Sequence, residues 1–552
     1  MAGRMTDIFP ESSLLAKRGN DKQICGMFSL LRNQTLFGNL VWRMFVVLCM
    51  GGCLTLHARA VELERIPREV LMDKIRGAWA GQMIGVAYGG PTEFKAAAQI
   101  NEDVIQPPVL TNSIDEDDLY VEMTFARVMD RVGLDATSLD YAVAFRDSKY
   151  RLWHANAGAR RNLSRGLLPP DSGNPRYNAH ADDIDFQIEA DFIGIMCPGM
   201  PRSSNRFCDK VGHVMNHGDG VYGGMFVCGM YCAAYFESDP QKIVEAGLAC
   251  IPARSSYAAL IRDLLDAFAR RPGSWSEAWQ IIEDKWNKDD ACPEGALSPF
   301  NIDAKLNGAY IAMGLLYGGG DFDRTMDIAT RCGQDSDCNP SSACGVIGAV
   351  LGFSRLPPHY QKETLEMADM KFSFTDYSFN DIVKSTEART VKLIQREGGK
   401  VTGQDLFIRR QKPQAPKLEQ CNFGVPTGLI HYTNSAWKWS SGWTNDDKVK
   451  AAYGAGSEAV LEFDGTGIDL LGQLSQGGGR ADVYIDGKRQ GLRADAWIPE
   501  RTSDKDLWRV YGLRNGHHTL RLMTLAEGDP RSKGARMAIS RAVVYQAKPS
   551  AR

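Results

Sequence analysis

The 552-residue sequence lacks several features that mark large classes of proteins. Its 64 lysines and arginines are balanced by 67 acidic residues, so a net charge of −3 leaves none of the basic excess on which binding to nucleic acids or anionic membranes depends. It has no apolar run of the ~20 residues that a membrane-spanning helix needs. Its 13 cysteines form no C-x-x-C pair and no zinc spacing. We therefore expect a globular protein with no nucleic-acid partner and no stable membrane insertion.

A short apolar segment near the start is the exception. "MFVVLCMGGCLTLHARA", Met44 to Ala60, follows Arg43 and ends in an A-x-A pattern. This layout predicts a secretory signal peptide that is cleaved before Val61, and hence a secreted or periplasmic protein. The polar residues 1–42 are long for the region that precedes such a core, so we expect the natural start to be Met44. A disordered extension before a buried helix is the alternative.

Cysteine usage agrees with export only in part. Cys25, Cys49 and Cys53 precede the predicted cleavage point, which leaves ten cysteines in the mature chain. Several of these lie in apolar, helix-like surroundings, as Cys228 and Cys344 do, and this favours buried small hydrophobic side chains. One or two disulfides remain an alternative in an oxidising compartment.

The remaining chain is too long for one ordinary domain and divides in two. Residues 61–399 carry apolar residues at helical spacing, which predicts an all-α domain. Residues 400–420 include the proline-rich "RQKPQAPKLEQ" and are predicted to be a linker. Residues 421–546 contain short alternating runs separated by Asp-Gly and Asn-Gly pairs, which predicts a jelly-roll β-sandwich.

Acidic residues gather at four places in the helical domain. A carboxylate at the start of a helix can cap it, whereas two such groups from distant parts of the chain can share a hard cation such as Mg²⁺, which prefers oxygen ligands. From spacing alone both interpretations stay open. The four places are Glu93 after a glycine-rich helix, "SIDEDDLYVEM" from Ser113, "HADDIDFQIEADFIG" from His180, and "RCGQDSDCNP" from Arg331.

Taken together, these stretches resemble the ADP-ribosylglycohydrolase family. "KIRGAWAGQMIGVAYGGPTEF" is similar to the opening helix of that family, "DEDDLYVEM" falls where the family has T-D-D-T, and "CGQDSDCNPSSACGVIGAVLGF" falls where it has G-x-D-x-D-T before a glycine-rich helix. "HGDGVYGGMFVCGM" and "DFQIEADFIGIMCPGMP" also resemble family segments. These motifs occur in the family's order between Asp73 and Phe353.

The resemblance implies an all-α fold whose active site holds one or two divalent cations, with magnesium expected and calcium or manganese as alternatives. By position it implies the metal ligands Glu116, Asp117, Asp118, Asp335 and Asp337. It also implies catalytic roles for Glu93, Asp117 and Asp335.

The sequence departs from the family pattern at four positions. Val86 replaces an aspartate, Glu116 and Leu119 replace threonines, and Cys338 replaces the threonine that closes the last motif. Sulfur suits Mg²⁺ poorly as a ligand. These departures bear on the number of ions, the choice of ion and the substrate.

Two other polar stretches are candidates for substrate binding. "LWHANAGARRNL" contains His154 and Asn156, and "HGDG" contains Asp219 and Gly220. Donors and aromatic side chains of this kind can line a sugar pocket, and they can equally belong to ordinary surface loops.

The predicted sandwich resembles the galactose-binding-like domains of secreted glycosidases and is a candidate carbohydrate-binding module. Its tryptophans could stack on sugars, but Trp437 and Trp439 are two residues apart, which places both on one strand face and favours core packing.

We therefore expect a cation-dependent hydrolase of a glycosidic bond, acting on a ribosyl-like or other pentofuranosyl glycoside as a small-molecule or glycan substrate. The alternatives are a true ADP-ribosyl-protein hydrolase, and a non-catalytic carbohydrate-binding protein with a degenerate site.

Overall fold

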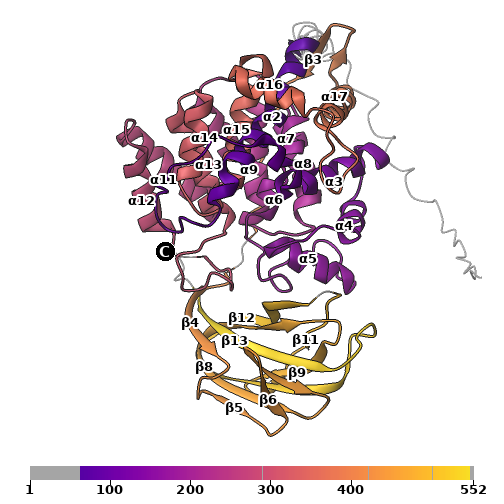
Figure 1. Cartoon of the computed structure of the whole chain (residues 1–552), viewed down its shortest axis with the longest axis vertical. Helices are drawn as coiled ribbons and strands as arrows, with labels where there is room; N and C mark the ends of the chain where they lie inside the picture. Colours follow the sequence, from indigo (N-terminus) through magenta and orange to yellow (C-terminus); the bar gives the residue numbers. More distant parts are fainter. Residues whose placement is uncertain (1–62, 289, 420–421, 500, 548–552) are drawn as a thin grey trace, which may run out of the picture. The chain divides into compact units, whose positions relative to one another are not determined.

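The helical and β regions follow one another as the sequence predicts. The computed structural model describes residues 63–288, 290–419, 422–499 and 501–547, and the predicted signal peptide, residues 1–60, lies outside them. Helices dominate to about residue 396, and a large antiparallel β region follows (Figure 1). This order confirms the predicted fold class. Within the described residues, no helix combines the length and apolar character needed to cross a membrane.

The helical region packs around one large apolar core. Helices α9, α13 and α15 are buried along nearly their whole length, whereas helices such as α11 bury one face. The helices are α2 (Arg68–Gly89), α3 (Asp117–Val132), α4 (Ser138–Arg146), α5 (His154–Ser164), α6 (Asp185–Ile188), α7 (Asp191–Ile195), α8 (Pro201–Gly212), α9 (Asp219–Ala234), α10 (Pro240–Leu248), α11 (Ser256–Arg270), α12 (Trp275–Trp286), α13 (Ala304–Gly318), α14 (Phe322–Arg331), α15 (Cys338–Leu351), α16 (Pro358–Glu366) and α17 (Phe379–Arg396), with the 3-10 turns η1 (Gly90–Thr92), η2 (Leu110–Asp115) and η3 (Phe353–Arg355).

Glycines on one face of α2 let α15 approach it closely. A Cβ added at Gly85 would lie 2.2 Å from the carbonyl oxygen of Pro340, and one at Gly89 would lie 2.0 Å from that of Ser336. Any larger residue would therefore force the two backbones apart. The contact runs along the whole helix pair and ends at the loop before α15, so it places the acids of that loop beside the end of α2. The glycines concerned are Gly77, Gly81, Gly85 and Gly89.

The first part of the predicted linker is a small sheet. β1 (Leu63–Pro67) pairs antiparallel with β3 (Asp405–Arg409), which also pairs with β2 (Lys400–Val401). Ile66, Leu406 and Ile408 are buried in the helical core. The sheet thus closes the helical region by joining its first segment to its last, and residues 410–419 that follow it have no regular structure.

The β region is antiparallel throughout its ladders and is built on three long strands. β8 pairs with β12 along most of its length and with β13 through its second half, while β12 also pairs with β9. The strands are β4 (Val425–His431), β5 (Trp437–Trp439), β6 (Trp443–Asp446), β7 (Val449–Tyr453), β8 (Glu458–Leu474), β9 (Gly479–Ile485), β10 (Lys488–Arg489), β11 (Ala494–Asp495), β12 (Thr502–Gly528) and β13 (Arg536–Gln546).

Three pairs, Asp464-Gly465, Asp486-Gly487 and Asn515-Gly516, predict turns between strands, and for two of them this prediction is wrong. Asp486 and Gly487, both with positive φ, do form the turn between β9 and β10. Gly465 and Gly516, in contrast, lie inside β8 and β12 and face each other in the ladder, next to a register shift. At these points the glycines allow the long strands to bend instead of reversing direction.

The tryptophans of the sandwich belong to its interior. Trp437, Trp443 and Trp497 are buried, and Trp439 stacks on Trp437 with ring centroids 4.6 Å apart. This arrangement supports core packing over an exposed sugar platform.

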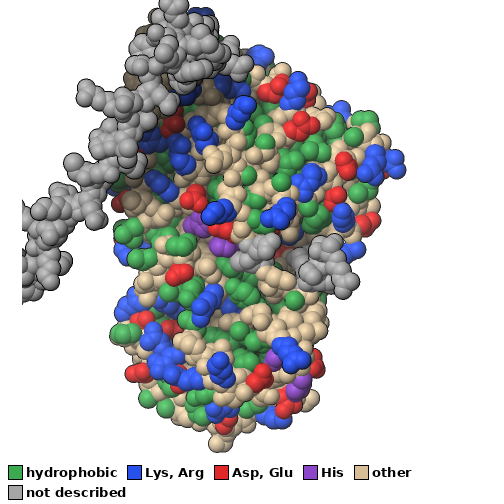
Figure 2. Space-filling view, turned by 180° about the vertical axis from the view of Figure 1, so that it is seen from behind, with side chains coloured by type: hydrophobic (Ala, Val, Ile, Leu, Met, Phe, Trp, Pro, Cys, Tyr) green, Lys and Arg blue, Asp and Glu red, His purple; other side chains and the backbone are tan. Residues whose placement is uncertain are grey.

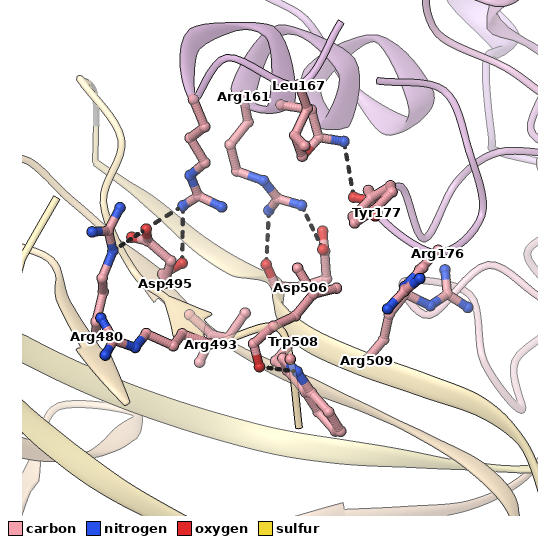
Figure 3. Close-up of a pocket in the computed structure, with 15 residues that line it drawn as sticks. Arg161, Leu167, Arg176, Tyr177, Arg480, Arg493, Asp495, Asp506, Trp508 and Arg509 are labelled. Atoms are coloured by element: carbon pink, nitrogen blue, oxygen red, sulfur yellow. Dashed lines mark hydrogen bonds and ion pairs between the residues drawn. The ribbon is translucent and has the colours of Figure 1, made fainter. Parts of the chain in front are cut away.

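Two arginines, one in α5 and one directly after it, form hydrogen bonds with the sandwich. Arg161 on α5 donates to the carbonyl oxygen of Asp506 at 2.7 Å and to its carboxylate at 2.5 Å (Figure 3). Arg165 donates to the carbonyl oxygens of Asp495 and Trp497. These pairs border a cavity of about 270 Å³. On the face in Figure 2, basic and acidic side chains are interspersed over both regions.

Candidate functional site

Glu93 is held by contacts between two loops. It follows η1, where the Thr92 hydroxyl lies 2.8 Å from the Ser336 hydroxyl. The Phe94 amide then donates to the Gln334 carbonyl oxygen at 3.0 Å. These bonds join the end of α2 to the loop that precedes α15, and so they bring Glu93 towards Asp335 and Asp337.

The starts of α3 and α15 bring the other acids together. Asp117 and Asp118 are the first two residues of α3, and Cys338 is the first residue of α15. The Cys338 thiol donates to Asp118 Oδ2 at 3.1 Å. Ligand atoms of Asp117, Asp118 and Cys338 lie within 4.8 Å of one another, as do those of Asp335, Asp337 and Cys338. The acids at the start of α3 and those before α15, which the resemblance predicts to share cations, therefore meet at Cys338.

We call the six acids at this point the acid group, and they strongly perturb one another. Burial, followed by the charge of Asp337, raises the pKa of Glu93 to about 7, that of Glu116 to about 8 and that of Asp117 to about 6. Burial also holds the pKa values of Asp118 and Asp335 well above the ordinary range. The acid group consists of Glu93, Glu116, Asp117, Asp118, Asp335 and Asp337.

Capping does not account for these acids. Asp337 occupies the N-cap position of α15 but makes no side-chain cap hydrogen bond, and Asp335 lies two residues further from the helix. Within the described residues, Asp118 Oδ1 and Asp337 Oδ1 are buried without a hydrogen-bond partner. Buried, unpartnered carboxylate oxygens from two helix starts fit a divalent cation, which supplies the missing positive charge.

The structure adds two acids that the sequence analysis noted only as part of an acidic stretch. Asp185 and Glu189 are buried on and just after α6, and Asp117 is among the charges that raise their pKa values. Asp185 accepts the backbone amides of Ala155 and Asn156, and Glu189 accepts the Asn156 side chain. Their i, i+4 spacing could have indicated a shared face, but not which helix start that face meets.

The four predicted substrate-binding residues separate into different places. Asn156 is hydrogen-bonded to Asp185 and Glu189, whose pKa values are raised in part by the charge of Asp117. Asp219 begins α9, and its charged neighbours are Lys305, Asp182 and Asp303. Gly220 is the second residue of α9, and a Cβ there would lie 2.6 Å from the Ala181 carbonyl oxygen, so this glycine allows a close approach of the two segments.

His154 lies beside the carboxylates of Asp183 and Glu294 instead, with its Nδ1 at 3.6 and 3.9 Å from them. Burial lowers the pKa of His154 to about 4.

The structure shows the surroundings of the four residues that depart from the family pattern. Val86 and Leu119 are fully buried in the apolar core, where an aspartate or threonine would need a polar partner. Glu116, half-buried beside Asp117 and Asp337, keeps a carboxylate at its position. Cys338 contributes a hydrogen bond to Asp118 rather than a hydroxyl.

Every cysteine that the structure describes is a buried free thiol, which fits the interpretation as small hydrophobic side chains.

The helical region matches the sequence model of a known protein family. The family model for ADP-ribosylglycohydrolase matches residues 67–391. A solved structure described as an ADP-ribosylglycohydrolase-related protein complex is 13% identical in sequence to this chain. The match covers 58% of this chain and 98% of the solved chain, with a TM-score of 0.38. No curated protein matches the chain.

Other solved structures match smaller parts of the chain. An active-site mutant of a family two carbohydrate esterase from Clostridium thermocellum is 19% identical over 22% of this chain and 36% of its own, with a TM-score of 0.16. The CBM36-1 domain of a xylanase from the hindgut metagenome of Trinervitermes trinervoides is 16% identical over 22% of this chain and 98% of its own, with a TM-score of 0.17. Scores this low carry no argument about function.

Proposed function

Because this chain belongs to the ADP-ribosylglycohydrolase family of hydrolases, we propose that it hydrolyses a glycosidic bond at the acid group with a divalent cation as cofactor. The supporting observation is that carboxylates from two helix starts are buried together, with Asp118 Oδ1 and Asp337 Oδ1 unpartnered. Carboxylate oxygens suit Mg²⁺ best, and Ca²⁺ and Mn²⁺ are the alternatives.

The acid group would divide the work between binding and proton transfer. Glu116, Asp117, Asp118, Asp335 and Asp337 would hold the cation, which supplies a Lewis acid that orients sugar hydroxyls and the attacking water. Glu93 stands at the edge of the group and is half-exposed. Its perturbed pKa makes it the candidate for accepting the proton of that water as the water oxygen bonds to the anomeric carbon and the glycosidic carbon–oxygen bond breaks, while the leaving oxygen takes up a proton from solvent.

The substrate class we favour is a ribosyl-like or other pentofuranosyl glycoside, as a small molecule or glycan. Asn156 lies within the same polar network and is the candidate for a contact with the sugar. The predicted signal peptide supports a secreted or periplasmic protein, and this is why we place an extracellular glycoside ahead of ADP-ribosylated protein.

A panel experiment tests the proposal. The mature protein is incubated with aryl pentofuranosides, other aryl glycosides and ADP-ribosylated protein, with Mg²⁺ or with a chelator, and sugar release is measured. We expect Mg²⁺-dependent release from a pentofuranoside, and loss of release in Asp335→Asn. Asp321→Asn is the matched control. The Asp321 carboxylate caps α14 by accepting a hydrogen bond from the backbone amide of Arg324, and asparagine can cap a helix in the same way.

The other outcomes identify the alternatives. Release from ADP-ribosylated protein alone would identify an ADP-ribosyl-protein hydrolase. Glycan binding without release from any substrate would identify a carbohydrate-binding protein with a degenerate site. Release that is unaffected by chelator would refute the role of the cation.

A further inference from the structure

A second group of ligand-type side chains lies outside the acid group. It contains His154 at the start of α5, His180 and Asp183 in the turn before α6, and Cys292 in the loop before α13. Asp183, His180 and Cys292 are buried, and His154 is 14% exposed. One ligand atom from each residue falls within 4.8 Å of the other three. Three separate segments of the chain thus meet at one point.

The distances within this group suit a tetrahedral metal ion. His180 Nδ1 lies 2.8 Å from Asp183 Oδ2 and 3.4 Å from Cys292 Sγ, and His154 Nδ1 lies 3.6 Å from Asp183 Oδ2. Zinc bonds of ~2.0–2.3 Å in a tetrahedron place neighbouring ligand atoms roughly 3.3–3.8 Å apart. Of these three pairs, that of His180 and Asp183 would have to separate by about half an ångström, and the remaining pairs lie within 4.8 Å.

The hydrogen bonds inside the group do not satisfy its members. Among the described residues, His154 Nδ1 and Asp183 Oδ1 are buried without a hydrogen-bond partner. His154 also has a φ of +35°, which is uncommon for a residue with a side chain. The protein therefore holds the His154 imidazole near the Asp183 carboxylate in a strained backbone conformation, with a ring nitrogen that has no hydrogen-bond partner among the described residues.

The surroundings provide an outer shell. The Glu294 carboxylate lies 3.7 Å from His180 Nε2, on the side of the ring away from Asp183, and it is paired with Lys505 of the sandwich. Metal-bound histidines commonly present their other nitrogen to a carboxylate, which orients the ring.

We propose that His154, His180, Asp183 and Cys292 bind one zinc ion. Thiolate and imidazole ligands favour zinc over magnesium, whereas the oxygen ligands of the acid group favour a hard cation. The site takes four protein ligands and keeps no open position, so the ion has a structural role. It ties the loop before α13 to α5 and to the turn before α6. The site does not depend on the proposed glycosidase activity.

A second group that contains histidines, made of His213, His217 and Glu419, shows the contrast. His213 Nε2 lies 2.9 Å from Glu419, whose other oxygen accepts the Gly218 amide at 2.7 Å. This group offers three ligands, and its carboxylate is already hydrogen-bonded, so we interpret it as an ion pair.

Metal analysis of the full mature protein tests the proposal. Protein purified in the presence of zinc is dialysed against Mg²⁺-containing buffer, and zinc per chain is measured by mass spectrometry. Cobalt is then substituted for zinc, and thiolate-to-cobalt absorption is recorded. We expect one zinc per chain and a tetrahedral cobalt spectrum. Cys292→Ser should remove the thiolate band, and His154→Gln, at the partly exposed ligand, should weaken zinc binding more than about 100-fold.

Two matched controls separate this site from other thiols. Cys332→Ser changes a buried thiol that contacts Met313, and Cys338→Ser changes the thiol of the acid group. Both should retain zinc and the cobalt spectrum. The proposal is overturned if the wild-type protein, folded by circular dichroism, retains no zinc. It is also overturned if Cys338→Ser abolishes binding while Cys292→Ser and His154→Gln leave it unchanged.

Discussion

Replacing Asp335 with asparagine tests the acid group most directly. Asp335 is 3% exposed, and its ligand oxygen lies within 4.8 Å of that of Asp337. At an effective dielectric constant of ~20, two carboxylate charges at this separation repel each other by about 3 kcal/mol. Asparagine keeps the shape of the side chain and removes one of these charges, so the repulsion within the group falls and one cation ligand is weakened.

The pH dependence gives the sign of the effect in chelator. The pKa of Asp117 rises from 3.8 to about 6, chiefly through burial and then through Asp337. At ~1.36 kcal/mol for each pKa unit, this corresponds to about 3 kcal/mol. Because the folded state binds the proton more tightly than the unfolded state does, this stability is present below about pH 4 and is lost as the pH rises through 6. Because Asp335→Asn removes a charge that repels Asp337, we expect the variant to be more stable than wild type in chelator at pH 8, by about 1–3 kcal/mol.

Cation binding should reverse that order. A cation at ~100 times its dissociation constant stabilises a protein by about 2.7 kcal/mol, which raises the melting temperature by roughly 5 °C in a domain of this size. We expect this rise for wild type and for Asp321→Asn, and less than a third of it for Asp335→Asn. Melting is followed while Mg²⁺, Mn²⁺ or Ca²⁺ is titrated. An equal rise in all three proteins would remove Asp335 from the site and refute the reasoning.

Three further predictions concern other parts of the chain. Gly85→Ala should lower the free energy of unfolding in urea by about 3 kcal/mol or more, because its Cβ would lie 2.2 Å from a backbone oxygen of α15. Gly273→Ala, with no atom within 4 Å of its Cβ, should change it by less than ~0.5 kcal/mol, and equal effects would contradict the glycine argument. Burial opposes protonation of His213, but Glu419 outweighs it and raises the pKa of His213, so stability from this pair is present below about pH 6.5 and is lost as the pH rises through the raised value. Glu419→Gln should flatten the plot of unfolding free energy against pH in that range, and an unchanged slope would contradict the pairing. The natural protein should begin at Val61 on N-terminal sequencing, and an intact Met1 in the cytosol would disprove export.

Local patterns in the sequence were sufficient to predict much of this protein. Glycines four residues apart in α2 must share one helix face, so a close helix partner could be expected before it was seen. Alternating short runs after residue 420 indicated strands for a similar reason. The family resemblance related Asp117 and Asp118 to Asp335 and Asp337, so the approach of these two acidic stretches could be expected from the sequence.

The tertiary structure decided what depends on partners distant in the chain. Periodicity shows which face of an element is buried, but it does not show against what, so it could not predict that β1 pairs with β3 or that Gly465 and Gly516 bend strands instead of ending them. The same holds for Cys292 and His180, which are 112 residues apart and have no metal-binding spacing in the sequence. Ligand geometry is a property of three-dimensional distance, and only the packing of α5, α6 and the loop before α13 brings these side chains to one point.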